Sequence, residues 1–415
     1  MQKRVIIIGG GIIGLCAAYY LSKEGHSVKV IDQSNLNSGA SYVNAGYLSP
    51  SHIIPLSAPG VMKKGLQWMF SPTSPLYVKP RFDLDFIKWA WAFNKSCTVE
   101  HVKKSAPLIR DITGLSQRLF EDIISTEKFS AHYEKKGLLM LCQTPKTLEN
   151  ELNMAELAVE LGLEAKEVCL EGIKEIEPGV AINAIGGIYY KCDHHSTPQE
   201  FMSDMKVYLK NAGVTLHGNE KVVDMEIQNG AIRTIQTNSQ LFQADEIVLA
   251  AGSWSSILTK KIGLDLLLQA GKGYRIDTEI ETQISIPAIL AEAKAAVTPM
   301  NGFTRFAGTM EIAGINHNIN RARVEAIASA ANRYYPNINL SHEEKGNAAC
   351  GLRPLSPDGL PYIGKSNKCK NLTIAAGHAM MGWSMGTATG LLVSEIISDK
   401  RPSLELNQFH PDRRF

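Results

Sequence analysis

Two short apolar runs, joined through a glycine-rich turn and a helical pattern, open the chain. The first run, Val5 to Ile8, leads directly into Gly9-Gly10-Gly11-Ile12-Ile13-Gly14, and the second, Val28 to Ile31, ends at Asp32. Strand, glycine turn, helix, strand and acid in this order predict the first βαβ unit of a mainly parallel sheet. The same order is typical of a site for a dinucleotide.

The glycines of this turn have separate expected tasks. Gly9 allows a tight turn, Gly11 lets the backbone approach a pyrophosphate, and Gly14 lets the helix pack closely on the strand. The pyrophosphate would lie at the helix N-terminus, where amide groups and the positive end of the helix dipole face it. Asp32 can accept hydrogen bonds from both ribose hydroxyls, and it would repel a 2′-phosphate.

The rest of the chain alternates between strand and helix patterns. Pro107 is expected to begin a helix, Thr197 and Glu200 to form a capping box, and Asn301-Gly302 to form a hairpin turn. Residues 49–78, rich in Pro, Gly and Ser, predict a long ordered loop. We expect strands over 132–142, 186–190, 214–216, 222–227, 295–300, 303–307, 349–354 and 372–375, and helices over 145–161, 198–211, 320–335 and 386–398.

Glycine-rich segments recur far beyond the opening unit. Glu246 to Trp254 repeats its order of apolar strand, small residues and turn, and further glycines lie near residues 351 and 382. A nicotinamide site is normally local to one half of a molecule, so this spread favours a longer ligand. Flavin adenine dinucleotide (FAD) fits, because its isoalloxazine lies far from its adenosine. The helix start at Gly382 to Gly386 could stabilise negative charge on the reduced ring.

Composition and charge narrow the classes of function. A chain of 415 residues is expected to form two domains. Its net charge of +2, without a basic run, argues against nucleic acid. The seven cysteines are scattered and never in Cys-x-x-Cys spacing, which predicts neither a disulfide framework nor a zinc site. His194 and His195 are adjacent and lack matched partners, so we expect loop residues and no metal.

Membrane and export signals are weak. The chain leads directly into its first strand, so we expect no signal peptide. No apolar run is long enough to span a bilayer. The segment Leu84 to Phe93, with Trp89 and Trp91, predicts a buried or interface helix in preference to a membrane contact.

A series of short motifs extends along nearly the whole chain. They are Val43-Asn44-Ala45-Gly46 with Ser49-Pro50, Ser57-Ala58-Pro59-Gly60-Val61, Trp68-Met69-Phe70, Lys272-Gly273-Tyr274, Met310-Glu311-Ile312-Ala313-Gly314, Gly351-Leu352-Arg353-Pro354-Leu355-Ser356-Pro357-Asp358-Gly359, Gly377-His378 and Gly382-Trp383-Ser384-Met385. Together these motifs resemble those of the flavin-dependent D-amino-acid oxidase superfamily, and within it the small subunits of bacterial D-amino-acid dehydrogenases. Ala379 departs from the family, which commonly has glycine there, and residues 192–195 match less closely.

The resemblance implies an α/β fold of two interleaved domains. A Rossmann-like FAD-binding domain with a mainly parallel sheet would comprise 1–50, 194–268 and 346–415. An α+β substrate domain with a mixed or antiparallel sheet would comprise 51–193 and 269–345. The FAD would be bound noncovalently, with the active site between the domains.

The resemblance also implies a reaction. A neutral D-amino acid would give its α-hydrogen as hydride to flavin N5, and the imine would hydrolyse to a 2-oxo acid and ammonia. Electrons would pass to a respiratory acceptor such as a quinone. Alternatives are a cyclic or N-substituted substrate (D-proline, hydroxy-D-proline, sarcosine or glycine), a flavoprotein subunit without turnover, and a nicotinamide dehydrogenase. We expect a cytoplasmic protein, and in one alternative it binds peripherally to the inner face of a bacterial inner membrane. The sequence is compatible with an oligomer and with a partner subunit.

Four residues are candidates for contact with the substrate. Arg353 stands in a Gly-x-Arg-Pro turn that in the superfamily presents an arginine to the substrate carboxylate, which its two parallel donors would orient. Tyr274 is a second carboxylate donor, a lid or a core aromatic, and Tyr47 is a candidate for the substrate pocket. His378 is a candidate base, although hydride transfer from a neutral amine needs none, so a hydrogen-bonding role is favoured.

A larger set is expected to bind the cofactor. Its members are Gly9, Gly11, Ile12, Ile13, Gly14, Asp32, Gln33, Ser41, Asn44, Ala45, Gly46, Val222, Ala250, Gly252, Trp254, Gly351, Arg353, Gly382, Trp383, Ser384 and Met385.

Overall fold

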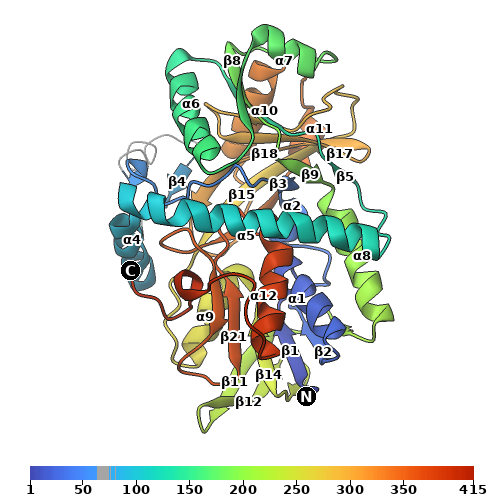
Figure 1. The fold of residues 1–415 in the computed structure, drawn as a ribbon, viewed down its shortest axis with the longest axis vertical. Coiled ribbons are helices and arrows are strands. Elements are labelled where there is room, and N and C mark those ends of the chain that lie inside the picture. Colours follow the sequence, from blue (N-terminus) through green and yellow to red (C-terminus); the bar gives the residue numbers. More distant parts are fainter. Residues whose placement is uncertain (63–73, 75, 80) are drawn as a thin grey trace.

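Two β-sheets form the framework of the molecule. The computed structural model describes residues 1–62, 74, 76–79 and 81–415. In Figure 1 the sheet that contains the N-terminal strand lies in the lower half, and the larger sheet lies in the upper half. The long helix α5 (Val99–Thr126) crosses the molecule between them. This arrangement leaves the two sheets free to face one another across a cavity.

The smaller of these sheets is mainly parallel. All its strands are parallel except β20, which pairs antiparallel with β21. Val5 and Ile7 of β1 belong to one core and Ile6 and Ile8 to another, so the continuous apolar run reflects burial on both faces. The strand order is β10 (Thr215–His217), β2 (Ser27–Ile31), β1 (Arg4–Ile8), β14 (Glu246–Leu249), β21 (Leu372–Ala376) and β20 (Tyr362–Lys365).

Helices α1 (Ile12–Lys23) and α12 (Gly386–Ile397) pack side by side against this sheet. Gly390 permits their close approach, because a Cβ there would stand 2.5 Å from the backbone carbon of Cys16. Apolar side chains of a small antiparallel sheet share the core on the opposite face. That sheet comprises β11 (Val222–Gln228), β12 (Ala231–Thr237) and β13 (Leu241–Phe242), with helix α9 (Ser255–Lys261) nearby.

The larger sheet is mixed. Strands β16 with β6 and β18 with β4 pair in parallel, and the other pairs are antiparallel. The order is β19 (Ala349–Leu355), β15 (Gln269–Thr278), β18 (Phe303–Ile312), β17 (Ala295–Met300), β16 (Ala288–Leu290), β6 (Leu138–Cys142), β8 (Gly186–Tyr190) and β7 (Ala165–Cys169), with β4 (Leu76–Val78) beside β18. Helix α10 (Arg321–Tyr334) packs on it and shares its core. The predicted fold class, a mainly parallel sheet with a mixed one, is confirmed.

The two sheets are interleaved in the sequence. Strand β19 falls in the range 346–415 that we assigned to the dinucleotide domain, yet it pairs with β15 of the larger sheet. The domain boundaries therefore stay a prediction, and β19 belongs by its pairing to the larger sheet. The remaining elements are α2 (Ala40–Val43), β3 (Tyr47–Leu48), α4 (Leu84–Ser96), β5 (Tyr133–Glu134), α6 (Pro145–Glu160), α7 (Leu170–Ile176), β9 (His194–Ser196), α8 (Pro198–Asn211), η1 (Gly252–Trp254), α11 (His342–Gly346) and η2 (Asn407–Phe409).

His194 and His195, which we expected in a loop, form strand β9 between β3 and β5. Three other local predictions also need correction. Pro107 lies inside α5 and does not begin it; Thr98 caps that helix by accepting a hydrogen bond from the amide of His101. The buried face of this long helix outweighs the one backbone hydrogen bond that proline removes. Within the predicted loop 49–78, Leu76–Val78 is a strand, while residues 63–73 and 75, with the Trp68-Met69-Phe70 motif, lie outside the described residues.

The third correction concerns the capping box predicted at the start of α8. Thr197 occupies the N-cap position and Pro198 the first turn, as predicted, but the side chain of Thr197 caps no helix amide. Its hydroxyl oxygen accepts a hydrogen bond from the amide of Asn301 at 2.9 Å, and Glu200 accepts one from the amide of His132 at 2.8 Å. Both side chains instead join α8 to neighbouring segments, a tertiary use that a local pattern does not reveal.

Candidate active site

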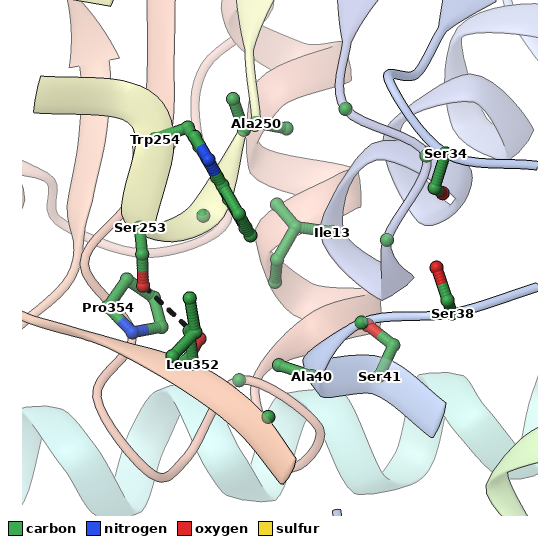
Figure 2. A pocket seen from close by; sticks show the side chains of 18 of the residues that line it. Ile13, Ser34, Ser38, Ala40, Ser41, Ala250, Ser253, Trp254, Leu352 and Pro354 are labelled. Carbon is green, nitrogen blue, oxygen red and sulfur yellow. Dashed lines mark hydrogen bonds between the residues drawn. The ribbon is translucent and has the colours of Figure 1, made fainter. Parts of the chain in front are cut away.

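A cavity of about 1000 Å³ lies where the two sheets meet. Its walls come from segments far apart in the sequence: the turn after β1, the end of β2, helix α2, the turn after β14, strands β15 and β19, and the loop after β21. Figure 2 shows side chains from several of these segments facing one another across the cavity. A parallel sheet binds its ligands beyond the carboxyl ends of its strands, and this cavity lies at that edge.

The glycine turn after β1 has the geometry that a close backbone approach requires. Gly9 has φ +112°, and a Cβ on it would stand 2.3 Å from the carbonyl oxygen of Ala250. A Cβ on Gly14 would stand 1.9 Å from the carbonyl oxygen of Gly9, so Gly14 serves the packing of α1 on β1. Gly11 is the N-cap of α1 and has no side chain to cap it. The first turn of α1 therefore presents backbone to the cavity.

Asp32 lies at the cavity wall and also organises the turn. One carboxylate oxygen accepts a hydrogen bond from the amide of Gly10 at 2.7 Å. The other accepts from the amide and hydroxyl of Ser34 at 2.7 and 2.6 Å. A carboxylate has about four acceptor positions, so capacity remains for a ligand hydroxyl.

The middle of the cavity is lined by apolar and small side chains. Figure 2 shows Trp254 extending toward Ile13 and the α2 segment, while the hydroxyl of Ser253 donates to the carbonyl of Leu352 at 3.2 Å. The indole of Trp254 also stacks on His317, with ring centroids 6.0 Å apart. The hydroxyl of Ser41 accepts a hydrogen bond from the amide of Ile12 at 3.0 Å and so joins α2 to the start of α1.

Arg353 of β19 is a cation at the cavity without an acidic partner. Its Nη1 donates to the carbonyl of Thr309 at 2.8 Å, and among the described residues no carboxylate lies within ion-pair distance of it. Burial lowers the pKa of Arg353 to about 10, which still leaves it charged at neutral pH. A buried cation without an anion is costly unless a ligand supplies one. The side chain is therefore available for a carboxylate.

Local backbone features position this guanidinium. A Cβ on Gly273 of β15 would stand 2.2 Å from Nη2 of Arg353, so the guanidinium lies where that side chain would be. On the neighbouring strand, Thr309 has φ +57° at a register shift between β15 and β18. A β-branched residue rarely adopts this conformation, and the bulge directs the Thr309 carbonyl to Arg353.

Tyr274 borders the cavity, but its hydroxyl does not face a substrate. The ring belongs to the same core as Val324 and Ile327 of α10, and the hydroxyl donates to Glu311 at 2.7 Å. Successive residues of a strand point to opposite faces, so Tyr274 points away from the face that Gly273 shares with Arg353. Of its predicted roles, a core aromatic agrees with this placement.

Tyr47 is not among the residues that line the cavity. Its hydroxyl oxygen lies 2.8 and 2.9 Å from the carbonyl oxygens of Ala288 and Val297, which share its one proton, and it accepts from the amide of Val297. The structure therefore does not place Tyr47 at the cavity where we expected it to contact a substrate. These hydrogen bonds join β3 to β16 and β17, which gives Tyr47 a structural role. Burial raises the pKa of the phenol, so its hydroxyl keeps its proton at neutral pH.

His378 lies at the cavity wall in a dry setting. It is 3% exposed, and its Nε2 is 3.0 Å from the hydroxyl of Thr389. Burial lowers its pKa to about 3, so the ring is neutral at pH 7. The imidazole is neutral and its Nε2 is hydrogen-bonded to Thr389. This state agrees better with a hydrogen-bonding role for His378 than with the role of a base.

The pKa of His378 predicts a pH dependence of stability. Its folded pKa lies below its unfolded value of about 6.5, so the unfolded chain binds the proton more readily as pH falls. The stability that the neutral ring contributes is complete above pH 6.5 and is lost on acidification. Relative to a His378→Asn variant, we expect the protein to lose roughly 1 kcal/mol of unfolding free energy per pH unit below 6.5. Parallel denaturant curves for both proteins between pH 8 and pH 5 would contradict this assignment.

Most predicted cofactor residues line one cavity. These are Gly9, Gly11, Ile12, Ile13, Asp32, Gln33, Ser41, Asn44, Val222, Ala250, Gly252, Trp254, Gly351, Arg353, Gly382 and Trp383. Gly14, Ala45, Gly46, Ser384 and Met385 are not among its lining residues.

The residues outside the lining have other contacts. Ala45 accepts a hydrogen bond from Thr298, and a Cβ on Gly46 would collide with the carbonyl of Ser196. The hydroxyl of Ser384 donates to the carbonyl of Tyr47, and Met385 is buried in the core beside α12. Sequence reasoning missed Gly273 as the space for Arg353, although the Lys-Gly-Tyr motif contained it. It also missed Arg275, whose position at the cavity depends on strand pairing.

The residues present fit a long dinucleotide. The cavity extends from Asp32 and Val222 at one end to Arg353 and His378 at the other, and side-chain-free backbone borders it near Gly11 and Gly351. A model of a family described as FAD dependent oxidoreductase (DAO) matches residues 4–396. The chain belongs to this family. Its cofactor is FAD, which the carboxylate of Asp32 and the start of α1 are placed to bind.

Similar proteins agree with this family assignment. A relative named D-amino acid dehydrogenase, from Vibrio atlanticus (strain LGP32), is 31% identical over 401 residues, covering 95% of each chain. The fold matches a glycine oxidase from Geobacillus kaustophilus with a TM-score of 0.80 and 21% identity, covering 100% of this chain and 99% of that one. It also matches an L-alpha-glycerophosphate oxidase from Mycoplasma pneumoniae solved with FAD bound, with a TM-score of 0.71 and 15% identity, covering 96% and 95%.

Proposed function

We propose that this FAD dependent oxidoreductase oxidises D-amino acids to 2-oxo acids and ammonia. The observation that carries the proposal is Arg353, a half-buried cation at the cavity with no acidic partner among the described residues. Relatives that cover nearly the whole chain and are named D-amino acid dehydrogenase support the choice of substrate.

Arg353 binds the substrate carboxylate in this proposal. Two parallel hydrogen bonds from a guanidinium fix orientation as well as position, and Thr309 and Gly273 keep the guanidinium in one place. FAD, when bound, supplies the hydride acceptor. No side chain needs to act as nucleophile, which agrees with the neutral, hydrogen-bonded state of His378.

The substrate class is tested by turnover and product analysis. The purified holoprotein is assayed with a quinone analogue and D- or L-enantiomers of alanine, phenylalanine and proline, and with hydroxy-D-proline, sarcosine and glycine. We expect D-alanine and D-phenylalanine to yield one 2-oxo acid and one ammonia per acceptor reduced. Preference for cyclic or N-substituted amino acids would favour that alternative, and absence of any turnover would favour a flavoprotein subunit.

The electron acceptor we propose is a respiratory quinone at the inner face of a bacterial membrane. Among the described residues, no helix is both long and apolar enough to cross a bilayer. Helix α4, however, buries Trp89 while Leu84, Ile87 and Trp91 are 76%, 51% and 63% exposed. These three lie on one side of the helix, with Lys88 and Lys95 exposed beside them. A helix of this kind is suited to the surface of an anionic membrane.

This surface makes a prediction for vesicle binding. With Leu84, Ile87 and Trp91 all changed to serine, we expect binding to phosphatidylglycerol vesicles to fall at least tenfold, because each apolar side chain contributes about 1 kcal/mol or more. The control is Val207→Ser, which removes an exposed apolar side chain from α8. Cosedimentation measures both. Equal binding of the parent and the triple variant would exclude α4 as the contact.

A further inference from the structure

One face of strand β15 places a second arginine near Arg353. Arg353 lies over Gly273, and side chains two residues apart in a strand point to the same face. Arg275 therefore shares this face, about 7 Å further along the strand. It also borders the cavity, as Arg353 does. Two guanidinium groups thus follow one another along a single wall.

The charge of Arg275 is only partly compensated. Its Nη1 is 2.5 Å from a carboxylate oxygen of Asp277, but the same carboxylate makes two hydrogen bonds to Arg305, at 2.8 and 2.9 Å. One anion is shared between two cations. Arg305 uses its remaining donors on the carbonyls of Tyr42 and Asn44.

Arg275 has a donor to spare. Its Nε is buried and has no hydrogen-bond partner among the described residues. Burial and the nearby Arg305 both lower the pKa of Arg275, so a further anion beside it would be stabilised. Arg305 is 1% exposed and fully engaged, which leaves Arg275 as the arginine of this cluster that a ligand can reach.

We propose that the cavity accepts acidic amino acids, with the α-carboxylate on Arg353 and the side-chain carboxylate on Arg275. This inference rests on the proposed function and names its substrate class. The two carboxylates of aspartate or glutamate lie a few bonds apart. Arg353 stands opposite Gly271 on the neighbouring strand and extends its guanidinium over Gly273, and Arg275 begins about 7 Å beyond Gly273 on the same face, so both carboxylates of one ligand can be met. An isosteric amide would leave the charge of Arg275 only partly compensated, so the site discriminates between acid and amide.

The test compares D-glutamate with D-glutamine and D-aspartate with D-asparagine. For the parent holoprotein we expect kcat/KM to favour the acid over its amide at least tenfold. In Arg275→Gln this ratio falls at least tenfold, and Arg275→Lys restores part of it. The control Arg321→Gln removes an exposed arginine at the start of α10 and leaves the ratio unchanged. A parent without preference for the acid, or an unchanged ratio in Arg275→Gln, would overturn the proposal.

Equilibrium binding separates this inference from the proposed function. Glutarate and butyrate differ by one carboxylate, and neither has an amine to be oxidised. In calorimetric titrations of the holoprotein, glutarate should bind at least tenfold more tightly than butyrate. In Arg275→Gln this difference in affinity should vanish, while butyrate should bind as it does to the parent. Glutarate selectivity without D-amino-acid turnover would refute the proposed function and keep the two-arginine site. Turnover without glutarate selectivity would do the reverse.

Discussion

Replacing Arg353 with leucine is expected to lower kcat/KM for amino-acid substrates by roughly 150- to 5000-fold while the protein keeps its FAD. The loss corresponds to about 3–5 kcal/mol, the usual cost when one partner of a desolvated, charge-assisted pair is removed. The cofactor should remain because its expected contacts are spread over many other lining residues, from Asp32 to Trp383. Steady-state kinetics and the visible absorbance of the purified variant measure the two effects.

A second variant tests the same residue without changing it. In Gly273→Ala, the new Cβ would stand 2.2 Å from Nη2 of Arg353, so the guanidinium must move from its place beside the Thr309 carbonyl. We expect a loss of kcat/KM in the same direction, with Arg353→Lys falling between parent and leucine variant because it keeps the charge and loses the fork. Near-normal turnover in Arg353→Leu would remove this arginine from the mechanism.

Gly9→Ala is expected to abolish FAD binding and to destabilise the fold by roughly 2–6 kcal/mol. Gly9 has φ +112°, which alanine adopts only with strain, and the added Cβ would stand 2.3 Å from the carbonyl oxygen of Ala250. That obstacle is backbone, and it directly follows β14, the strand that pairs with β1, with its own amide bonded to the carbonyl of Ile8, so it cannot move without disturbing the sheet. Flavin content after purification and a denaturant curve check the prediction.

The matched control is Gly25→Ala. Gly25 also has a positive φ, +80°, but its Cβ would meet nothing within 4 Å. It should therefore show only the cost of the strained backbone, about 1 kcal/mol, with its flavin retained. Full flavin in Gly9→Ala would mean that the turn after β1 does not approach the cofactor.

The dinucleotide end of the site was the most predictable part. The signal there is local: Gly9, Gly11 and Gly14 follow one strand, and Asp32 ends the next, so the chemistry follows from neighbouring residues. The same holds for the hairpin at Asn301-Gly302, where Gly302 has φ +80°. In these places propensity and tertiary structure agree.

The substrate end was less predictable because it depends on strand register. Tyr274 and Arg275 are adjacent and both border the cavity, and the sequence does not reveal which of the two shares a strand face with the guanidinium of Arg353. The strand pairing decides this. Gly273 lies opposite Gly351, and the guanidinium of Arg353 lies over Gly273. The side chain of Tyr274 therefore points to the opposite face of β15, toward α10. Tyr47 was misplaced for a similar reason, since its hydroxyl partners lie about 240 residues away in β16 and β17.

Helix ends were misjudged where side chains serve tertiary contacts. Thr197 and Glu200 have the spacing of a capping box, but both bind segments brought close only by the fold. Pro107 looked like a helix start because the stabilising contacts of α5 lie elsewhere in the molecule. In each case the local rule predicted an element correctly and assigned its terminal residue to the wrong task.

Oxidation of D-amino acids by the bound FAD is visible directly in the absorbance spectrum of the holoprotein under anaerobic conditions, before and after addition of D- and L-amino acids. We expect a flavin band that D-enantiomers bleach and L-enantiomers leave intact, with bleaching at least 100-fold slower in Arg353→Leu. A flavin band that no amino acid bleaches, or that bleaches equally fast without Arg353, would contradict it.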